Sequence, residues 1–147
     1  MLTKLLPDQV SKFWDVIRYA IENSLPPIAG ESPDKMKKIL MSLLTGKSQC
    51  WVSYEINESS KVFEAIVITR IFYDDASDTK SLLIYCLYGY EHIKQSSFTS
   101  GLKTLVKFAG SRGCERIIAY TSEPGVIKLV NRLGGDTSYT FISIPLY

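Results

Sequence analysis

Apolar residues in the first third of the chain recur at helical spacing and predict two helices. From Asp8 onward they share one helical face until the prolines at 26 and 27. A second stripe follows residues 32–34, whose serine, proline and aspartate are typical of a helix N-terminus, and it ends at Gly46. Residues 2–6 predict a short strand before both helices.

The middle of the chain changes to the pattern of strands. Three segments are rich in β-branched and aromatic residues and are separated by the turn-like NESS and DDASDT: CWVSYEI, KVFEAIVITRIFY and SLLIYCLYGY. Because the connections are short, these segments predict an antiparallel meander. The second and third are apolar on both faces, which indicates central strands covered on both sides.

The last third alternates between helix and strand. Residues 97–110 predict a helix, RIIAYT a short buried strand, and a further helix runs from Ser122 to the glycines at 134 and 135. SYTFISIPL predicts a final strand. The whole order is strand, two helices, three strands, helix, strand, helix, strand. It predicts an α+β fold with a mixed, mostly antiparallel central sheet, flanked by about four helices and closed by right-handed crossovers.

Composition narrows the class of protein without naming a function. The 147 residues are 46% hydrophobic, which fits a single domain over residues 1–147. The net charge of +2, with one short lysine run at residues 35–38, gives no footprint for nucleic acid. No segment approaches the roughly 18 apolar residues of a membrane span. The three cysteines are far apart and form no CxxC pair, so we expect no disulfide or metal site and a reducing cytoplasm.

The element order resembles that of the GNAT superfamily of CoA-dependent N-acyltransferases over nearly the whole chain. The local resemblance is clearest at LVKFAGSRGCERIIAYTSEPGVIKLVNRLGG, which is similar to the family's core helix, fifth strand and fourth helix. The resemblance implies acetyl-CoA or another acyl-CoA as co-substrate and an amine acceptor, either a small molecule or a protein. It also implies that SLLIYCLYGY offers unpaired backbone groups to the pantetheine arm at a splayed pair of strands. A homodimer stays open.

The loop EHIKQSSFTSG lies where the family binds the coenzyme pyrophosphate. The family pattern there is Gln or Arg, two residues, Gly, one residue, then Gly or Ala, and no register of this loop satisfies it. A helix N-terminus attracts anions without glycines, and hydroxyl or ammonium groups can add donors. The predicted cofactor-binding residues are therefore Lys94, Ser96, Ser97, Phe98, Thr99, Ser100 and Tyr88. The alternative is that Ser96 or Ser97 only caps the helix.

A base that takes the proton of the amine needs a pKa near the working pH. The candidates are Glu64 in the second strand of the meander, and Glu91 and His92 just after the third. His92 is the only histidine and titrates in a suitable range, although a lone histidine in a loop is often an exposed bystander. Glu64 lies in an apolar run, where a buried carboxylate needs a partner or a raised pKa. Alternatively, Glu64 faces solvent.

Two further features bear on activity. The family's proton donor to the departing thiolate is a tyrosine in the fourth helix, and Val130 stands in its place, where it can donate nothing. Tyr120 and Tyr139 are nearby in sequence but are interpreted as packing residues. The strand aromatics either wall a substrate pocket or reflect β-propensity alone: Phe72, Tyr73, Tyr85, Tyr88 and Tyr90.

Two functions therefore remain open from the sequence. The first is an acyltransferase with a degenerate phosphate loop. The second is an inactive GNAT-fold binding or structural protein, such as a phage assembly component, because short glycine-poor chains look like GNAT-like proteins encoded by tailed bacteriophages.

Overall fold

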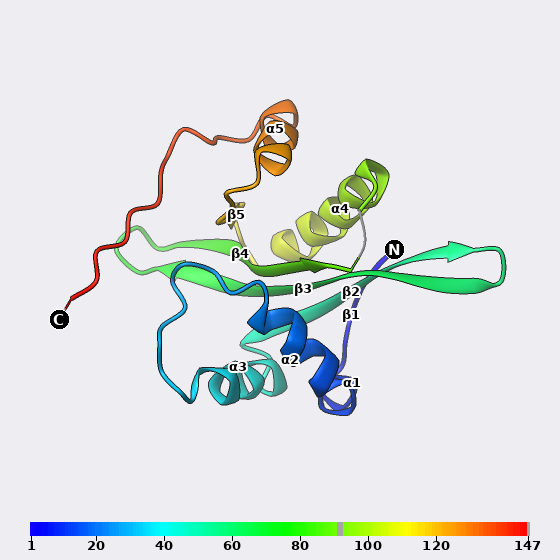
Figure 1. Cartoon of the computed structure of the whole chain (residues 1–147). Coiled ribbons are helices and arrows are strands. Elements are labelled where there is room, and N and C mark those ends of the chain that lie inside the picture. The colour runs from blue at the N-terminus through cyan, green and yellow to red at the C-terminus, as the bar shows by residue number, and fades with distance from the viewer. Residues whose placement is uncertain (91–92, 147) are drawn as a thin grey trace.

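The computed structural model describes residues 1–90 and 93–146, and within them the chain forms a five-stranded sheet in the order β1-β2-β3-β4-β5 (Figure 1). The strands are β1 (Leu2–Lys4), β2 (Ser48–Asn57), β3 (Ser60–Asp74), β4 (Thr79–Gly89) and β5 (Arg116–Ala119), and the helices are α1 (Pro7–Lys12), α2 (Trp14–Glu22), α3 (Lys35–Leu44), α4 (Gln95–Ser111) and α5 (Pro124–Arg132). The first four strands pair antiparallel, and β5 joins β4 in parallel. This mixed sheet confirms the predicted fold class.

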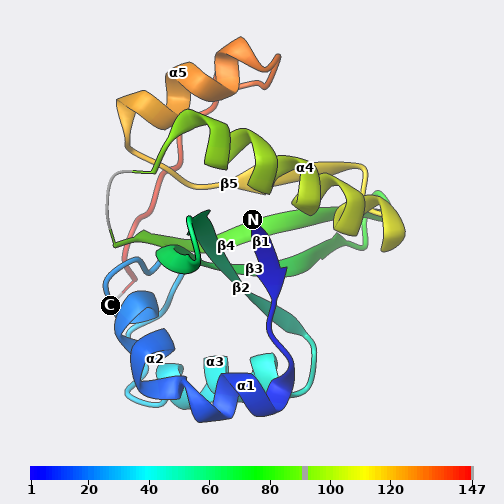
Figure 2. The ribbon, with the colours of Figure 1, turned by 90° about the vertical axis from the view of Figure 1, so that its right-hand side faces the viewer.

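Helices cover both faces of the sheet, as Figure 2 shows. The helices α1, α2 and α3 pack on one face around Ile66 and Ile68 of β3, and α4 packs on the other face around Val67. Since consecutive residues of β3 point into two different cores, the strand is central and buried on both sides, as predicted.

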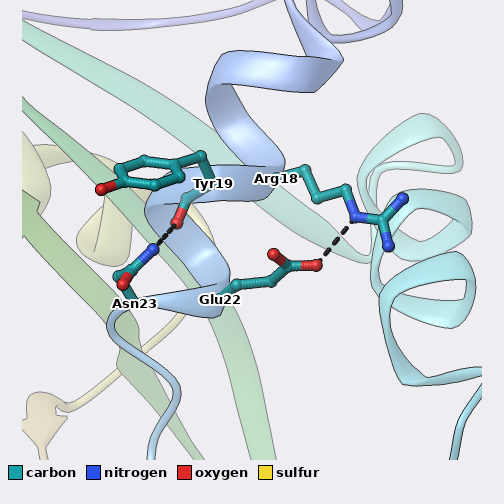
Figure 3. Close-up of polar contacts among 4 residues, drawn as sticks. All are labelled: Arg18, Tyr19, Glu22 and Asn23. Atoms are coloured by element: carbon teal, nitrogen blue, oxygen red, sulfur yellow. Dashed lines mark hydrogen bonds and ion pairs between the residues drawn. The ribbon is translucent and has the colours of Figure 1, made fainter.

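The first predicted helix is divided in two by Phe13, whose backbone leaves the helical region between α1 and α2. The end of α2 is tied by Asn23, whose side-chain amide donates to the Tyr19 carbonyl at 2.8 Å (Figure 3). On its exposed side Arg18 forms an ion pair with Glu22 at 2.8 Å. The charge of Arg18 is therefore already balanced within its own helix.

The second predicted helix starts later than its sequence suggests. Asp34, not Ser32, is the N-cap of α3, and the Ser32 hydroxyl instead accepts a 3.3 Å hydrogen bond from the Asp34 N–H. The predicted end is confirmed, because Gly46 has a φ of +80°, a conformation that side chains other than glycine's rarely adopt.

The predicted final strand is wrong. Residues 133–146 form no strand, and Figure 1 shows the tail beyond α5 as a coil that does not join the sheet. Its apolar side chains are exposed, with 86% of Tyr139 and 94% of Leu146 accessible. A strand requires a partner for its backbone groups, and a β-rich sequence alone does not supply one. The last predicted helix is confirmed as α5, which begins at Pro124 directly after its N-cap, Glu123. None of the residues of α5 is fully buried.

The three cysteines are free thiols, and two of them belong to the core. Burial raises the pKa of Cys50 to about 12 and that of Cys86 to about 11, so both remain protonated and unreactive at neutral pH. None of the helices in the described part of the chain is long and apolar enough to cross a bilayer.

Candidate functional site

The strands β4 and β5 separate halfway along β4. Their last paired residues are Ile84 and Ala119, whereas β4 continues to Gly89 and, within residues 1–90 and 93–146, pairs there with β3 alone. The side of β4 that faces away from β3 therefore carries N–H and C=O groups, from Tyr85 to Gly89, that have no partner strand among the described residues. This is the splayed strand pair that the sequence predicted, with SLLIYCLYGY as the open strand.

A β-bulge lies where the separation begins. Ile68 of β3 pairs with Cys86 and Thr69 pairs with Ile84, so Tyr85 has no partner in β3. Bulges redirect the side chain of the extra residue and increase the local twist, and they are common beside active sites. The bulge therefore changes the direction of the Tyr85 side chain, and it does so where β4 loses its pairing with β5.

Buried hydrogen bonds hold β3 in place next to this bulge. The Thr69 side chain is fully buried; its hydroxyl accepts from Trp51 Nε1 and donates to Gln49 Oε1, both at 2.9 Å. Satisfied polar groups of this kind fix the relative position of the strands that carry them. These hydrogen bonds therefore fix the position of β3 where the open edge of β4 begins.

The helix α4 begins directly beyond the open strand. The N-cap residue of α4 is Lys94, whose side chain makes no capping hydrogen bond. The Lys94 carbonyl accepts hydrogen bonds from the N–H groups of Ser97 and Phe98 at 3.0 and 3.1 Å. The N–H groups of Gln95 and Ser96 have no acceptor among the described residues. Two free donors and the positive end of a 17-residue helix form a suitable environment for an anion.

The alternative that Ser96 or Ser97 only caps α4 is wrong, because both lie inside its first turn. Their hydroxyls have no hydrogen-bond partner in the part of the chain that the structure describes, so they can donate to a ligand. The Thr99 hydroxyl is already occupied by the Gln95 carbonyl at 3.1 Å. Phe98 is half-buried and Ser100 is exposed. That these side chains contact a coenzyme stays a prediction.

Lys94 is paired with a carboxylate. Its Nζ lies 2.9 Å from Glu55 Oε1 on β2. The hydrogen bond to Glu55 and the charge of Glu55 raise the pKa of Lys94, and the charge of Glu64 adds to this effect. Pairing between Lys94 and a phosphate, as predicted, would require this ion pair to open.

Glu64 is buried at a second bulge, so the alternative of a solvent-facing Glu64 is wrong. Ala65 pairs with Ser53 and Phe63 pairs with Tyr54, which leaves Glu64 without a partner in β2. Its side chain is 8% exposed, and its Oε1 has no hydrogen-bond partner among the described residues. That Glu64 is catalytic stays a prediction. The other two candidate bases, Glu91 and His92, lie outside the described residues.

The position of Glu64 along the open part of β4 bears on its possible role as a base. Its carbonyl accepts the Tyr90 N–H at 2.9 Å, so it lies at the α4 end of the open strand. Tyr85, at the other end, is five residues earlier, which corresponds to about 16 Å at roughly 3.3 Å per residue. Glu64 therefore lies beside the helix end and far from the bulge at Tyr85.

The structure separates the five strand aromatics. Tyr88 packs edge-to-face with Tyr19 of α2 and with Tyr90, at centroid distances of 5.9 and 5.0 Å. Tyr88 thus packs on the α2 side of the sheet, and its contact with a coenzyme stays a prediction. Phe72 and Tyr73 are half-exposed near the β3–β4 turn.

In α5, Val130 packs against Gly135, where an added Cβ would clash with Val130 Cγ1. The Tyr120 ring contacts Phe141 edge-to-face at 5.0 Å, in agreement with a packing role. Tyr139 is 86% exposed, so its interpretation as a packing residue is wrong. Across this region, a valine remains at the position where the family resemblance implies a proton donor.

Sequence reasoning missed a cavity on the opposite face of the sheet. It has a volume of about 280 Å³ and lies between α3, the α2–α3 loop and Tyr85 of β4. Its cationic residues come from α3 and β3. The lysine run at residues 35–38 was the one signal in the sequence, and it did not reveal that Arg70 and Tyr85 would join it.

Comparison with known proteins identifies the fold. No family model matches the sequence, and neither does any curated protein. Among solved structures, a probable acetyltransferase superposes with a TM-score of 0.67 at 12% identity, covering 100% of this chain and 98% of its own. A predicted acetyltransferase from Clostridium acetobutylicum, solved with acetyl-CoA, has a TM-score of 0.65 at 14% identity, and the match covers 99% of this chain and 95% of that one. AAC(6')-Iy, in complex with the bisubstrate analogue CoA-S-monomethyl-acetylneamine, has a TM-score of 0.65 at 14% identity, with coverage of 100% of this chain and 97% of its own. The chain has the GNAT acetyltransferase fold.

Proposed function

We propose that the protein is a CoA-dependent N-acyltransferase, which transfers an acyl group from acetyl-CoA or another acyl-CoA directly to an amine. The observation that carries this proposal is the open edge of β4, from Tyr85 to Gly89, leading to the uncapped N-terminus of α4. An arm that contains amides can bond to an open strand edge, and a pyrophosphate can bind a helix end. Two structural neighbours were solved with acetyl-CoA and with a CoA bisubstrate analogue, which supports an acyl-CoA as co-substrate.

In this arrangement the coenzyme lies along the open strand, with its pyrophosphate at α4 and its acyl end towards Ile84. The free N–H groups of Gln95 and Ser96 bind the pyrophosphate, with the hydroxyls of Ser96 and Ser97 as further donors. The arm follows β4 back towards Ile84, where pairing with β5 closes the gap. The acyl carbonyl then lies near the bulge at Tyr85.

Transfer forms one bond and breaks another. The amine nitrogen attacks the thioester carbonyl, a C–N bond forms, and the C–S bond breaks to release the CoA thiolate. Val130 has no proton to give, so the thiolate takes its proton from water. A direct base must lie within hydrogen-bond reach, and among the described residues Glu64 lies about 16 Å along β4 from Tyr85, so in this proposal the amine proton also leaves through water.

The second candidate function is a binding or structural protein with the GNAT fold, for example a phage assembly component. Two observations favour it over an enzyme. Lys94 is held by Glu55, which also brings a negative charge close to the helix end. A valine occupies the place of the usual proton donor. Both would weaken coenzyme binding or turnover, so the first test concerns binding.

The thermal unfolding midpoint in millimolar acetyl-CoA tests the proposal, since a ligand bound only by the native state must raise it. We expect a rise for the wild type and none for Ser96→Glu. The new carboxylate repels the pyrophosphate, yet an acid in the first turn favours the helix itself, so α4 should still form. The control, Ser59→Glu, adds the same charge in the exposed β2–β3 turn and should keep the shift.

Two results would count against this site. An unmoved midpoint in the wild type would remove the acyltransferase and leave the binding or structural protein. A shift that survives in Ser96→Glu would place the coenzyme away from α4. Release of CoA in the presence of an amine then separates a coenzyme-binding protein from an enzyme.

A further inference from the structure

The cavity behind Tyr85 has a wall of positive charge. Lys35 and Lys38 contribute from α3 and Arg70 from β3, and none of the residues that line the cavity is acidic. Within the described residues none of these three cations forms an ion pair. Arg18, on the neighbouring α2, is by contrast neutralised by Glu22 (Figure 3). The cavity therefore keeps positive charges that no ion pair of residues 1–90 and 93–146 compensates.

The interior of the cavity can also hold polar groups. Ser48 is 6% exposed, and its hydroxyl lies 3.0 Å from that of Ser42, both on the lining. The volume of about 280 Å³ is at the small end for ligand sites, which suits a molecule the size of an amino acid or an amino sugar.

The cavity and the open strand meet at Tyr85. Tyr85 lines the cavity, and it is the bulged residue next to Ile84, the last residue of β4 that pairs with β5. Burial raises the pKa of the Tyr85 phenol and the charge of Arg70 opposes that rise, which places the guanidinium within electrostatic reach of this residue. A molecule in the cavity would thus adjoin the end of the open strand at which the acyl group is proposed to lie.

We propose that this cavity is the acceptor site and that its substrates are small amines that carry an anionic group, a carboxylate or a phosphate, bound by Arg70, Lys35 and Lys38. This inference rests on the proposed acyltransferase function. The anion anchors the molecule by charge-assisted hydrogen bonds, of which the planar guanidinium can supply two in parallel.

The same charges favour the chemistry. An amine attacks only as the free base, and neighbouring positive charges disfavour its ammonium form. Any positive charge that the bound anion leaves uncompensated therefore favours the free base of the amine, which offsets the lack of a carboxylate base near Tyr85 in the described part of the chain. Anchoring the anion and releasing the amine proton are two effects of one set of cations.

Matched pairs of amines test the inference, with CoA release as the measurement. Glycine is compared with glycinamide, and glucosamine 6-phosphate with glucosamine, at equal concentrations of free-base amine, because a nearby anion raises the pKa of an amine. Each pair then differs in the anion. We expect kcat/KM to be at least about tenfold higher for the anionic member of at least one pair, and the pair that shows it distinguishes carboxylate from phosphate recognition. Arg70→Gln should remove most of that preference, whereas the control Lys37→Gln, on the same helix as Lys35 but outside the cavity lining, should retain it.

A binding measurement separates this inference from the proposed function. The thermal midpoint is recorded with glucosamine 6-phosphate, glucosamine, glycine and glycinamide, without acetyl-CoA, for the wild type, Arg70→Gln and Lys37→Gln. Stabilisation by an anionic member that depends on Arg70, without CoA release from any amine, would retain the anion site and remove the acyltransferase. Transfer without preference for the anionic members would overturn the acceptor class and keep the acyltransferase. Neither transfer nor Arg70-dependent stabilisation would overturn both.

Discussion

At the scale of single residues, Glu64 has the burial expected of a reactive carboxylate but not the position. Its side chain is 8% exposed and its Oε1 is without a partner among the described residues, a state often found at functional sites. Its backbone carbonyl, however, accepts a hydrogen bond from the Tyr90 N–H at the α4 end of the open strand. Because a general base acts only within hydrogen-bond reach or through one water, position has more weight than burial here.

Substitution of Glu64 by glutamine tests this argument. Glu64→Gln keeps the shape of the side chain and removes its ability to accept a proton. We expect kcat with the best amine to stay within about threefold of wild type and the pH–rate profile to keep its form, since loss of a true base costs at least roughly a hundredfold. A loss of that size, with the acidic limb of the profile gone, would show that Glu64 is the base after all. The unfolding midpoint serves as the control for a general loss of structure.

The burial of Glu64 could be predicted from sequence, but its setting could not. Phe63 and Ala65 flank it with apolar side chains, which indicated an unusual carboxylate. The bulge at Glu64 depends on the register between β2 and β3, and a register is a property of two strands that neither one encodes alone. The same applies to Tyr85, whose bulge places it between the open strand and the cationic cavity.

At the scale of elements, the uncapped end of α4 faces a local electrostatic conflict. The helix offers free N–H groups from Gln95 and Ser96, but Glu55 of β2 forms an ion pair with the side chain of the N-cap residue, Lys94. A carboxylate near the site opposes an incoming pyrophosphate, and the paired Lys94 cannot compensate until it is released. The chain thus has the parts of an anion site together with a competitor for one of them.

Removal of that competitor should improve coenzyme binding. Glu55→Gln frees Lys94 and deletes one negative charge, so we expect the Kd for acetyl-CoA to fall by about threefold to fivefold, the modest gain typical of exposed charges. Isothermal titration at low and high salt measures it, and the gain should shrink at high salt because screening weakens the new contact. Glu58→Gln, in the turn of the same hairpin, is the matched control and should leave the Kd unchanged. A weaker Kd for Glu55→Gln would show that the ion pair supports the site.

At the scale of the whole molecule, the sheet separates two tasks. The α4 face carries the proposed coenzyme end, the α3 face carries the cationic cavity, and Tyr85 lies where β4 connects them. Most of the fold could be predicted from sequence, because amphipathic periods and short turns are local signals. The final strand could not, because SYTFISIPL has the composition of a strand but the described chain supplies no partner for its backbone.

The C-terminal tail should therefore contribute little to stability. Its contacts with the rest of the chain include one edge-to-face pair, Phe141 with Tyr120, and an exposed hydrogen bond from Thr137 to Asn131 at 2.8 Å. Both cores lie in the sheet and in α1 to α4. We expect deletion of residues 136–147 to lower the free energy of unfolding by no more than about 1.5 kcal/mol, the upper value for an aromatic pair. Urea denaturation measures the change.

A matched substitution identifies the contact that accounts for that small loss. Phe141→Ala in the full chain removes the aromatic pair and leaves the rest of the tail, so it should reproduce most of the effect of the deletion. The slope of the unfolding free energy against urea should also stay nearly constant, because a tail that is already exposed adds little new surface on unfolding. A loss of several kcal/mol on deletion, or a clearly smaller slope, would contradict this account, since either result requires the apolar residues of the tail to be buried in solution.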